Sequence, residues 1–272
     1  MKSALSVLLL CFLLASCGEE KAVETEEAIR ERAEAGDVEA QKKLAAIYLK
    51  KSFFTGLPKD APEAAKWGRK AAEQGDAVAQ LDLGWMYDKG IGVPENDAEA
   101  VKWYRKAAEQ GNLIGQNTLG WMYKNGEGVP KDYAEAAKWY RKAAEQGDAD
   151  AQSHLGWMYD KGIGVPENDA EAVKWYRKAA EQGQADSQYN LGWKYHKGNG
   201  VPQNDAEAVK WFRKAAEQGN LIGQNTLGWM YENGEGVPKD MAEATKWYRK
   251  AAEQGDADAK EWLEENAKEK GE

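Results

Sequence analysis

Side chains that could perform catalysis or bind a metal ion are scarce in this chain, whose 272 residues include two histidines and two cysteines. His154 and His196 stand where other copies of an internal repeat carry Asp, Thr or Lys, so both are predicted to be surface residues. Neither has a second histidine or a cysteine at ligand spacing, and we predict no zinc site and no cofactor. Carboxylate pairs such as Glu95 and Asp97 are typical of helix caps and solvated faces. Without a nucleophile–base pair, we expect neither enzymatic activity nor a small-molecule substrate.

The cysteines, Cys11 and Cys17, belong to an N-terminal segment with the pattern of a secretory signal, in which a basic residue precedes an apolar run. The run is too short to span a bilayer, and it ends in Leu-Ala-Ser-Cys. This ending resembles the lipobox of bacterial lipoproteins, in which the peptide before the cysteine is removed and the thiol receives a diacylglycerol. The resemblance implies a signal peptide over residues 1–16, a lipid on Cys17 and an acidic tether over residues 17–25. An ordinary signal peptide with an incidental cysteine is the alternative.

The residue after Cys17 bears on the destination of the protein. It is Gly18 rather than an aspartate. By resemblance to enterobacterial sorting rules, this implies an outer-membrane lipoprotein that faces the periplasm.

The composition favours helices and disfavours nucleic acid as a partner. Ala, Glu, Lys, Gln and Gly are abundant, whereas Ile, Phe and Thr are few, and this bias favours helix over sheet. Charged residues make up 31% of the chain and the formal net charge is -9. An acidic chain lacks the basic surface that neutralises phosphates. We therefore expect an all-α protein that does not bind nucleic acid.

A repeat of 36 residues organises the rest of the chain. One tryptophan series runs from Trp67 to Trp247 and a second from Trp85 to Trp229, both at this spacing. Apolar positions at helical spacing predict two antiparallel helices in each repeat. A Gly-x-Gly-Val-Pro loop joins the two helices, and residues 50–58 replace it in the first repeat. The second helix opens with a predicted capping box, in which the side chains of an Asn or Asp and a Glu three residues later satisfy each other's backbone amides.

Three motifs carry a resemblance to a known family. Ala-x-x-x-Leu-Gly-x-x-Tyr, Gly-x-Gly-Val-Pro and Ala-x-x-Trp-Tyr-x-x-Ala-Ala-x-x-Gly recur from Asp37 to about Gly255. On these residues the chain resembles the Sel-1-like repeat family, a relative of the tetratricopeptide repeats. The resemblance implies an α/α superhelical solenoid of antiparallel helix pairs that acts as an adaptor. Some secreted members staple each pair with a disulfide. These repeats contain no cysteine, so packing between units must stabilise them.

The period also predicts the domain organisation. Capping helices are expected over residues 26–36 and 256–272, each with a solvated outer face. The six repeats between them are expected at residues 37–75, 76–111, 112–147, 148–183, 184–219 and 220–255. Residues 83–111 and 155–183 are identical in sequence. Such copies favour an extended binding surface over a unique catalytic pocket.

One face of each first helix is a candidate binding surface. At about 100° per residue, Leu83 and Tyr87 face the second helix, whereas Trp85 lies opposite. In the superhelix that the resemblance implies, this opposite face lines the concave groove. One tryptophan per unit forms the tryptophan ladder: Trp85, Trp121, Trp157, Trp193 and Trp229. Apolar surface beside it is expected from Leu81, Ile114, Tyr189 and Ile222.

Packing against the next unit is an equal alternative for the ladder tryptophans. Trp103 and its equivalents differ, because they share a helix stripe with Ala100 and Ala107. This second series is predicted to be buried.

These observations favour a lipid-anchored envelope scaffold. We expect protein partners in the periplasm or at the cell surface, with the lipid on Cys17 in the membrane. The family resemblance implies an envelope assembly factor, an immunity protein against a toxic periplasmic effector, or a binder of host factors, and the sequence does not select among them. Glycan or peptidoglycan binding by the ladder is the alternative. The residues beside the ladder change from Leu81 to Asn117 to Ser153, which disfavours a sugar site with fixed polar partners.

Overall fold

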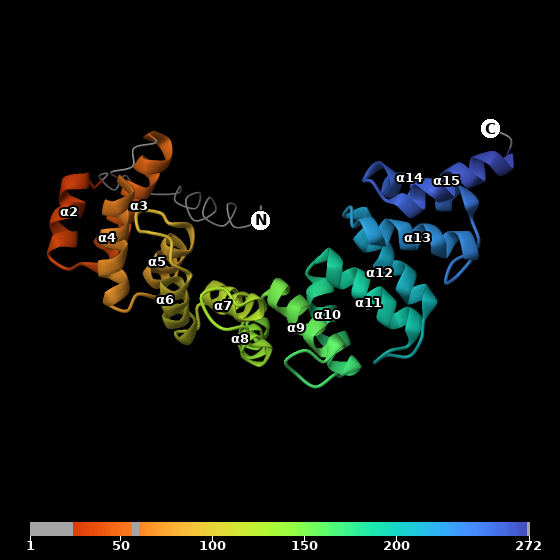
Figure 1. Ribbon diagram of the computed structural model, residues 1–272, viewed down its shortest axis with the longest axis horizontal. Coiled ribbons are helices and arrows are strands. Elements are labelled where there is room, and N and C mark those ends of the chain that lie inside the picture. Colours follow the sequence, from red (N-terminus) through yellow and green to blue (C-terminus); the bar gives the residue numbers. More distant parts are fainter. Residues whose placement is uncertain (1–23, 56–59, 271–272) are drawn as a thin grey trace.

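The computed structural model describes residues 24–55 and 60–270, and its regular elements within those ranges are all α-helices (Figure 1). α2 (Glu26–Glu34) and α15 (Ala257–Lys270) stand at the two ends. The helices between them form pairs, of which the first three are α3 (Val38–Thr55) with α4 (Asp60–Glu73), α5 (Ala77–Lys89) with α6 (Asp97–Glu109), and α7 (Leu113–Asn125) with α8 (Tyr133–Glu145). The next three are α9 (Ala149–Lys161) with α10 (Asp169–Glu181), α11 (Ala185–Lys197) with α12 (Asp205–Glu217), and α13 (Leu221–Asn233) with α14 (Met241–Glu253). The predicted all-α solenoid is confirmed.

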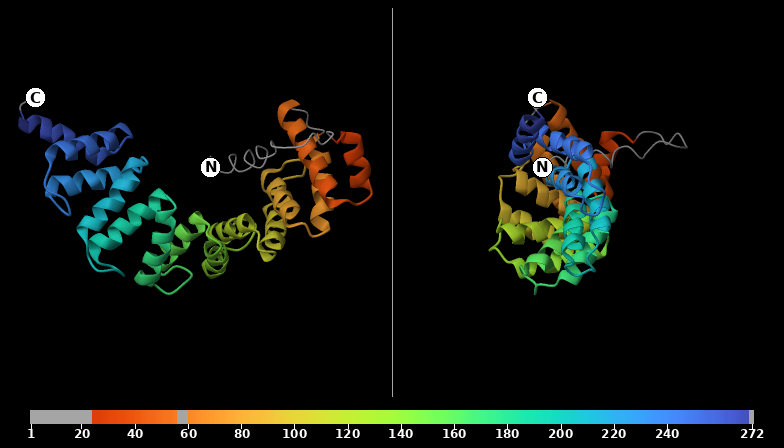
Figure 2. Two further views of the ribbon diagram at one scale, coloured as in Figure 1. Left: turned by 180° about the vertical axis from the view of Figure 1, so that it is seen from behind. Right: turned by 90° about the vertical axis from the view of Figure 1, so that its right-hand side faces the viewer.

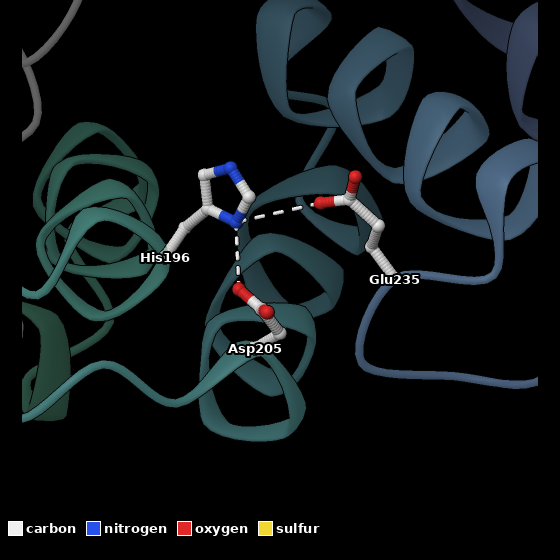
Figure 3. A group of neighbouring side chains, drawn as sticks. All are labelled: His196, Asp205 and Glu235. Atoms are coloured by element: carbon white, nitrogen blue, oxygen red, sulfur yellow. Dashed lines mark hydrogen bonds and ion pairs between the residues drawn. The ribbon is translucent and has the colours of Figure 1, made fainter.

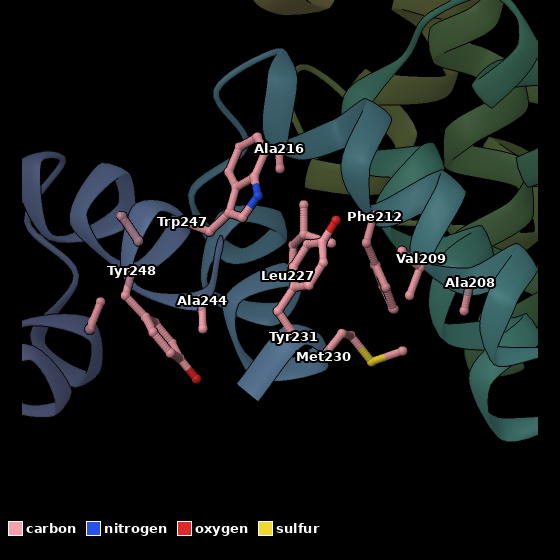
Figure 4. Packing of buried hydrophobic residues seen from close by; sticks show 12 residues of the cluster. Ala208, Val209, Phe212, Ala216, Leu227, Met230, Tyr231, Ala244, Trp247 and Tyr248 are labelled. Carbon is pink, nitrogen blue, oxygen red and sulfur yellow. The ribbon is translucent and has the colours of Figure 1, made fainter. Parts of the chain in front are cut away.

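Each helix packs mainly against the helices before and after it in the chain. The array therefore extends as a curved arc with α2 at one end and α15 at the other (Figures 1 and 2). Its core is a succession of apolar clusters along the array. Figure 4 shows the cluster nearest the C-terminus, where Phe212 of α12, Leu227 of α13 and Tyr248 of α14 are buried together. Such nearest-neighbour packing is the one-dimensional architecture of repeat proteins.

The helix ends follow from local side-chain chemistry. Gly90 has a φ of 64° and ends α5 in the left-handed conformation that glycine adopts without strain. Asn96 Oδ1 accepts a hydrogen bond from the Glu99 amide at 3.0 Å and opens α6. The reciprocal half of the predicted capping box is wrong. The Asn96 amide donates to the Tyr87 carbonyl at 2.9 Å instead, and the Glu99 carboxylate pairs with Lys102.

From the second repeat onward, the loop inside the repeat contacts the preceding unit. Gly128 has a φ of +67°, and a Cβ on it would lie 2.3 Å from the carbonyl oxygen of Asp97. The same close approach recurs at Gly92, Gly164, Gly200 and Gly236. The first glycine of the Gly-x-Gly motif therefore caps a helix, and the second lets the loop approach the helix start of the previous repeat.

Two sets of polar contacts connect successive units. In the glutamine ladder, the buried Gln116 donates to the Ala108 carbonyl of the preceding repeat at 3.0 Å and accepts from Gln146 at 2.7 Å. Equivalent bonds are made by Gln41, Gln80, Gln152, Gln188 and Gln224. In the second set, an arginine donates to a tyrosine of the next repeat, as Arg177 does to Tyr195 at 2.7 Å. These bonds, buried where a glutamine donates to a carbonyl and partly buried or exposed elsewhere, couple the units without cysteine.

The first repeat departs from the expected loop. α3 continues through Thr55, so residues 50–55 are helical rather than a replacement loop. The physical reason is that Lys51 stands where Gly90 ends α5, and no left-handed glycine stops the helix there. Among the described residues, none of the helices is both long and apolar enough to span a membrane. The predicted signal peptide and Cys17 lie outside the described residues.

Candidate functional site

The tryptophan ladder lies on the first helices α5, α7, α9, α11 and α13, and it divides into two kinds of residue. Trp121 and Trp229 are 42% and 37% exposed. Trp85, Trp157 and Trp193 are half-buried and pack against the core clusters of their own and neighbouring repeats. The packing alternative therefore holds for three of the five ladder residues, and contact with a partner stays a prediction for the exposed Trp121 and Trp229.

The exposed large apolar side chains of the described residues all lie on first helices, namely Val78, Ile114, Trp121, Ile222 and Trp229. Ile114 and Trp121 are seven residues apart, nearly two helical turns, so they share one face of α7. The same spacing joins Ile222 to Trp229 on α13. In the two repeats between them, Asp150 and Asp186 occupy the position of the isoleucines. This face, the first-helix face, thus carries one apolar patch on α5 and α7 and another on α13.

Two other residues proposed for this surface are less available. Leu81 is partly buried against the cluster formed by α6, α7 and α8. The ring of Tyr189 lies 5.7 Å from Phe212 and 6.3 Å from Trp193, measured between centroids. Both side chains therefore pack against the core and the ladder, and they add little exposed apolar surface to it.

The second tryptophan series is buried, as predicted. Trp103 is 7% exposed, and its equivalents in the other repeats are 3–7% exposed. A lysine covers each of these rings, as Lys106 Nζ does at 3.9 Å from the Trp103 ring centroid. Beside two members of this series, Trp103 and Trp175, lie open depressions of about 440 Å³ each, lined by a mixture of charged and uncharged residues. Neither depression brings a nucleophile together with a base.

The fifth repeat replaces an apolar core residue by a lysine. Lys194 stands where the second, third, fourth and sixth repeats carry Met86, Met122, Met158 and Met230, and it is 7% exposed. Its ammonium contacts Asp160 and lies 2.5 Å from Asp169 Oδ1. Burial alone would lower the pKa of Lys194, but the bonds to these two carboxylates raise it on balance. Lys194 therefore remains charged and joins the fourth repeat to the fifth.

The prediction that both histidines are surface residues is wrong. His196 is 7% exposed. His154 lies 4.7 Å from the Tyr140 ring, and burial, aided by the charge of Lys124, lowers its pKa to about 4. The error has a physical cause. The residues that stand in for His196 in other repeats are polar, but they are partly buried and paired, as Asp160 is with Lys194.

The structure also brings together a cluster that sequence reasoning missed. His196 meets Asp205 and Glu235 (Figure 3). These residues are nine and 39 positions apart and belong to two different repeats. Aligning each residue to its position in the repeat could have revealed the cluster. The end of a first helix, the start of the second helix and the loop of the next repeat meet at the junction between units.

Comparison with known proteins agrees with this architecture. A family model described as Sel1 repeat matches residues 38–76, 77–112, 114–148, 149–184, 185–220 and 222–256. The solved Sel1 repeat protein from Oxalobacter formigenes is similar over 79% of this chain and 84% of its own, with 37% identity and a TM-score of 0.69. A protective antigen of uropathogenic Escherichia coli strains, c5321, is similar over 86% of this chain and 65% of its own, with 34% identity and a TM-score of 0.56. No curated protein matches the chain significantly.

Proposed function

Because the chain belongs to the Sel1 repeat family, we propose that it is a scaffold that binds a protein partner along its first-helix face. Sel1 repeat proteins are generally non-enzymatic scaffolds. One observation carries the proposal. The exposed large apolar side chains of the described residues are confined to the first helices. Apolar side chains gathered on one face of a soluble protein are typical of protein–protein contact sites.

The chemistry of this face suits a protein more than a sugar. An isoleucine accompanies each of the two exposed tryptophans, Trp121 and Trp229. It lies on the same helix face, about two turns away. Aliphatic surface binds apolar side chains of a partner, whereas a sugar ring needs fixed polar groups beside the aromatic ring. Asp150 and Asp186 interrupt the apolar surface between the two patches. A partner that contacts both patches therefore extends along several repeats.

We further propose that the protein is an outer-membrane lipoprotein that faces the periplasm. A lipid on Cys17 would hold it in the bacterial envelope. The Leu-Ala-Ser-Cys ending of the N-terminal apolar run supports this location. The tether between Cys17 and α2 would leave the repeat array free to reach a partner near the membrane.

The exposed rungs provide the test of partner binding. We expect the double variant Trp121→Ala/Trp229→Ala to lose most of its affinity, because truncating a tryptophan hot spot costs about 2 kcal/mol or more, roughly thirtyfold in affinity. Its melting temperature should change by no more than about 2 °C, because both rings are more than one-third exposed. The measurement is crosslinking followed by affinity capture from envelope extract, with wild type and variant compared side by side.

The matched control changes exposed residues of the second helices instead. Lys102→Ala/Lys210→Ala alters two exposed side chains of second helices, 65% and 69% exposed, and should capture the same proteins as wild type. If the tryptophan variant retains those proteins and the lysine variant loses them, the partner binds the second helices and the proposed surface is wrong. Quenching of ladder fluorescence by peptidoglycan fragments, with no captured protein, would favour the glycan alternative.

A further inference from the structure

Three potential metal ligands converge where the fifth repeat meets the sixth (Figure 3). His196 Nδ1 lies 2.7 Å from Asp205 Oδ1 and 3.8 Å from Glu235 Oε2. One ligand atom from each residue lies within 4.8 Å of those of the other two. His196 lies near the end of α11, Asp205 is the first residue of α12, and Glu235 lies in the loop after α13. The cluster therefore spans two repeats and three elements.

The imidazole of His196 is held in place by two rungs of the ladder. Its ring centroid lies 5.2 Å from that of Trp193 and 5.9 Å from that of Trp229, both in edge-on geometry. The histidine is 7% exposed, so its ring is fixed by packing. The orientation directs Nδ1 toward both carboxylates. Ligands held by packed neighbours in this way need little rearrangement to bind an ion.

The charges around His196 Nδ1 call for a cation. A neutral imidazole donates one hydrogen bond from Nδ1 at most, so it satisfies only one of the two carboxylates. Within the described ranges, neither Asp205 nor Glu235 forms an ion pair with a lysine or arginine. Two carboxylates at this separation repel each other unless a positive charge lies between them.

The preceding junction shows how the same positions are neutralised elsewhere in the fold. Asp160 and Asp169 are the repeat equivalents of His196 and Asp205, and the ammonium of Lys194 contacts both. The equivalent of Lys194 in the sixth repeat is Met230, which brings no charge. One junction thus contains a lysine ammonium between its carboxylates, and the next has an imidazole nitrogen and two carboxylates without a lysine or arginine.

We propose that His196, Asp205 and Glu235 bind a divalent transition-metal ion, with zinc as the best match. One imidazole nitrogen and two carboxylate oxygens are a ligand set that zinc accepts, and three protein ligands leave a fourth position for water or a partner's side chain. Tetrahedral zinc sites place neighbouring ligand atoms about 3.3 Å apart. The distances of 2.7 and 3.8 Å from Nδ1 lie on either side of this value. All three ligand atoms lie within 4.8 Å of one another, so the separations need to change by no more than about 1.5 Å to form the site.

A bound ion would have a structural effect that does not depend on the proposed function. It would join α11 and α12 of the fifth repeat to the loop of the sixth. It would also fix the histidine between Trp193 and Trp229. The interface between these two repeats should therefore become more stable when the metal binds.

Calorimetric titration of the tag-free chain with zinc chloride tests the site directly. The chain carries Cys11→Ser and Cys17→Ser so that thiols do not compete for the metal. We expect one ion per chain and a higher melting temperature with zinc. His196→Gln should weaken binding at least about tenfold, as should Glu235→Gln, whose position holds Asn199 or Ile163 in other repeats and therefore tolerates the change.

The other histidine supplies the matched control. His154→Gln removes a histidine outside the cluster and should bind zinc as wild type does. The proposal is overturned if wild type binds no zinc, or if His196→Gln binds it as tightly as wild type. It is also overturned if calcium binds equally well and only Glu235→Gln weakens both ions, because the site would then be an oxygen-ligand site without the histidine.

Discussion

His154 occupies a position that is Thr118 and Thr226 in the adjoining repeat and the last one, and its ring lies over Tyr140. Burial lowers its pKa to about 4 from an ordinary value of 6.5. Between these two pKa values, His154 is protonated in the unfolded chain and unprotonated in the folded chain. The stability associated with this residue is therefore present above about pH 6.5 and is lost as the pH falls toward 4.

We expect His154→Thr to remove this pH dependence. Between pH 7.5 and pH 5, wild type should lose about 2 kcal/mol more unfolding free energy than the variant. Urea unfolding at the two pH values measures the difference. Equal losses in the two proteins would show that His154 takes up its proton in the folded state near its ordinary pKa. Carboxylates elsewhere contribute equally to both proteins and cancel in the comparison.

Single residues also show what the sequence could and could not predict. Burial of Trp103 followed from its place on one helix stripe with alanines, and the two helices of each repeat followed from apolar positions at helical spacing. The surroundings of His196 did not follow, because its neighbours come from the next helix and the next repeat. A polar residue that recurs as Asp, Lys or Glu suggests solvent, yet at this position the polar groups are paired inside a junction.

At the scale of elements, the loop that follows the first helix is fixed, from the second repeat onward, by contact with the repeat before it. Gly128 and Gly147 make this contact testable, because both have a positive φ, of +67° and +102°. A Cβ on Gly128 would lie 2.3 Å from the Asp97 carbonyl oxygen, whereas a Cβ on Gly147 meets nothing within 4 Å. The two positions share backbone strain and differ in space.

Gly147→Ala should cost about 1–2 kcal/mol of stability, the strain of a left-handed alanine. Gly128→Ala should cost about 2 kcal/mol more than that, because the loop must also move away from α6. Chemical denaturation of the two variants measures the difference. Similar losses in both would mean that the loop does not press on the preceding repeat.

Elements were the scale at which sequence reasoning was most successful. The 36-residue period places two helices in each repeat because tryptophans, alanines and glycines recur in fixed phase. The exception is α3, which continues to Thr55. The glycine that ends the other first helices is missing there. The repeat pattern alone therefore does not predict where α3 ends.

For the whole molecule, the arc and the proposed lipid are complementary. The array presents its apolar patches on the first-helix face, and the N-terminal segment would fix one end to the membrane. The solenoid could be predicted because every repeat presents the same packing faces. The division of the ladder into exposed and half-buried rungs could not, because it depends on the side chains of neighbouring units.

We expect Cys17→Ser to abolish membrane attachment. Acyl chains contribute about 0.8 kcal/mol per buried methylene, so the proposed lipid would make attachment of wild type effectively permanent. Metabolic labelling with palmitate and fractionation of the envelope measure it, and Cys11→Ser is the control, because that residue would leave with the signal peptide. A Cys17→Ser variant that still labels and sediments with membranes would contradict the proposed anchor.

The nearest-neighbour contacts of the array have a mechanical consequence. The glutamine ladder and the apolar clusters join each repeat only to the ones beside it, so a pull applied at the two ends is carried by every junction in series. The weakest junction yields first, and the others keep their contacts. Each of the last five repeats releases 36 residues when it gives way, about 120 Å of extended chain. A scaffold held by a membrane at one end and a partner at the other would therefore lengthen in steps under load, while both attachments remain intact.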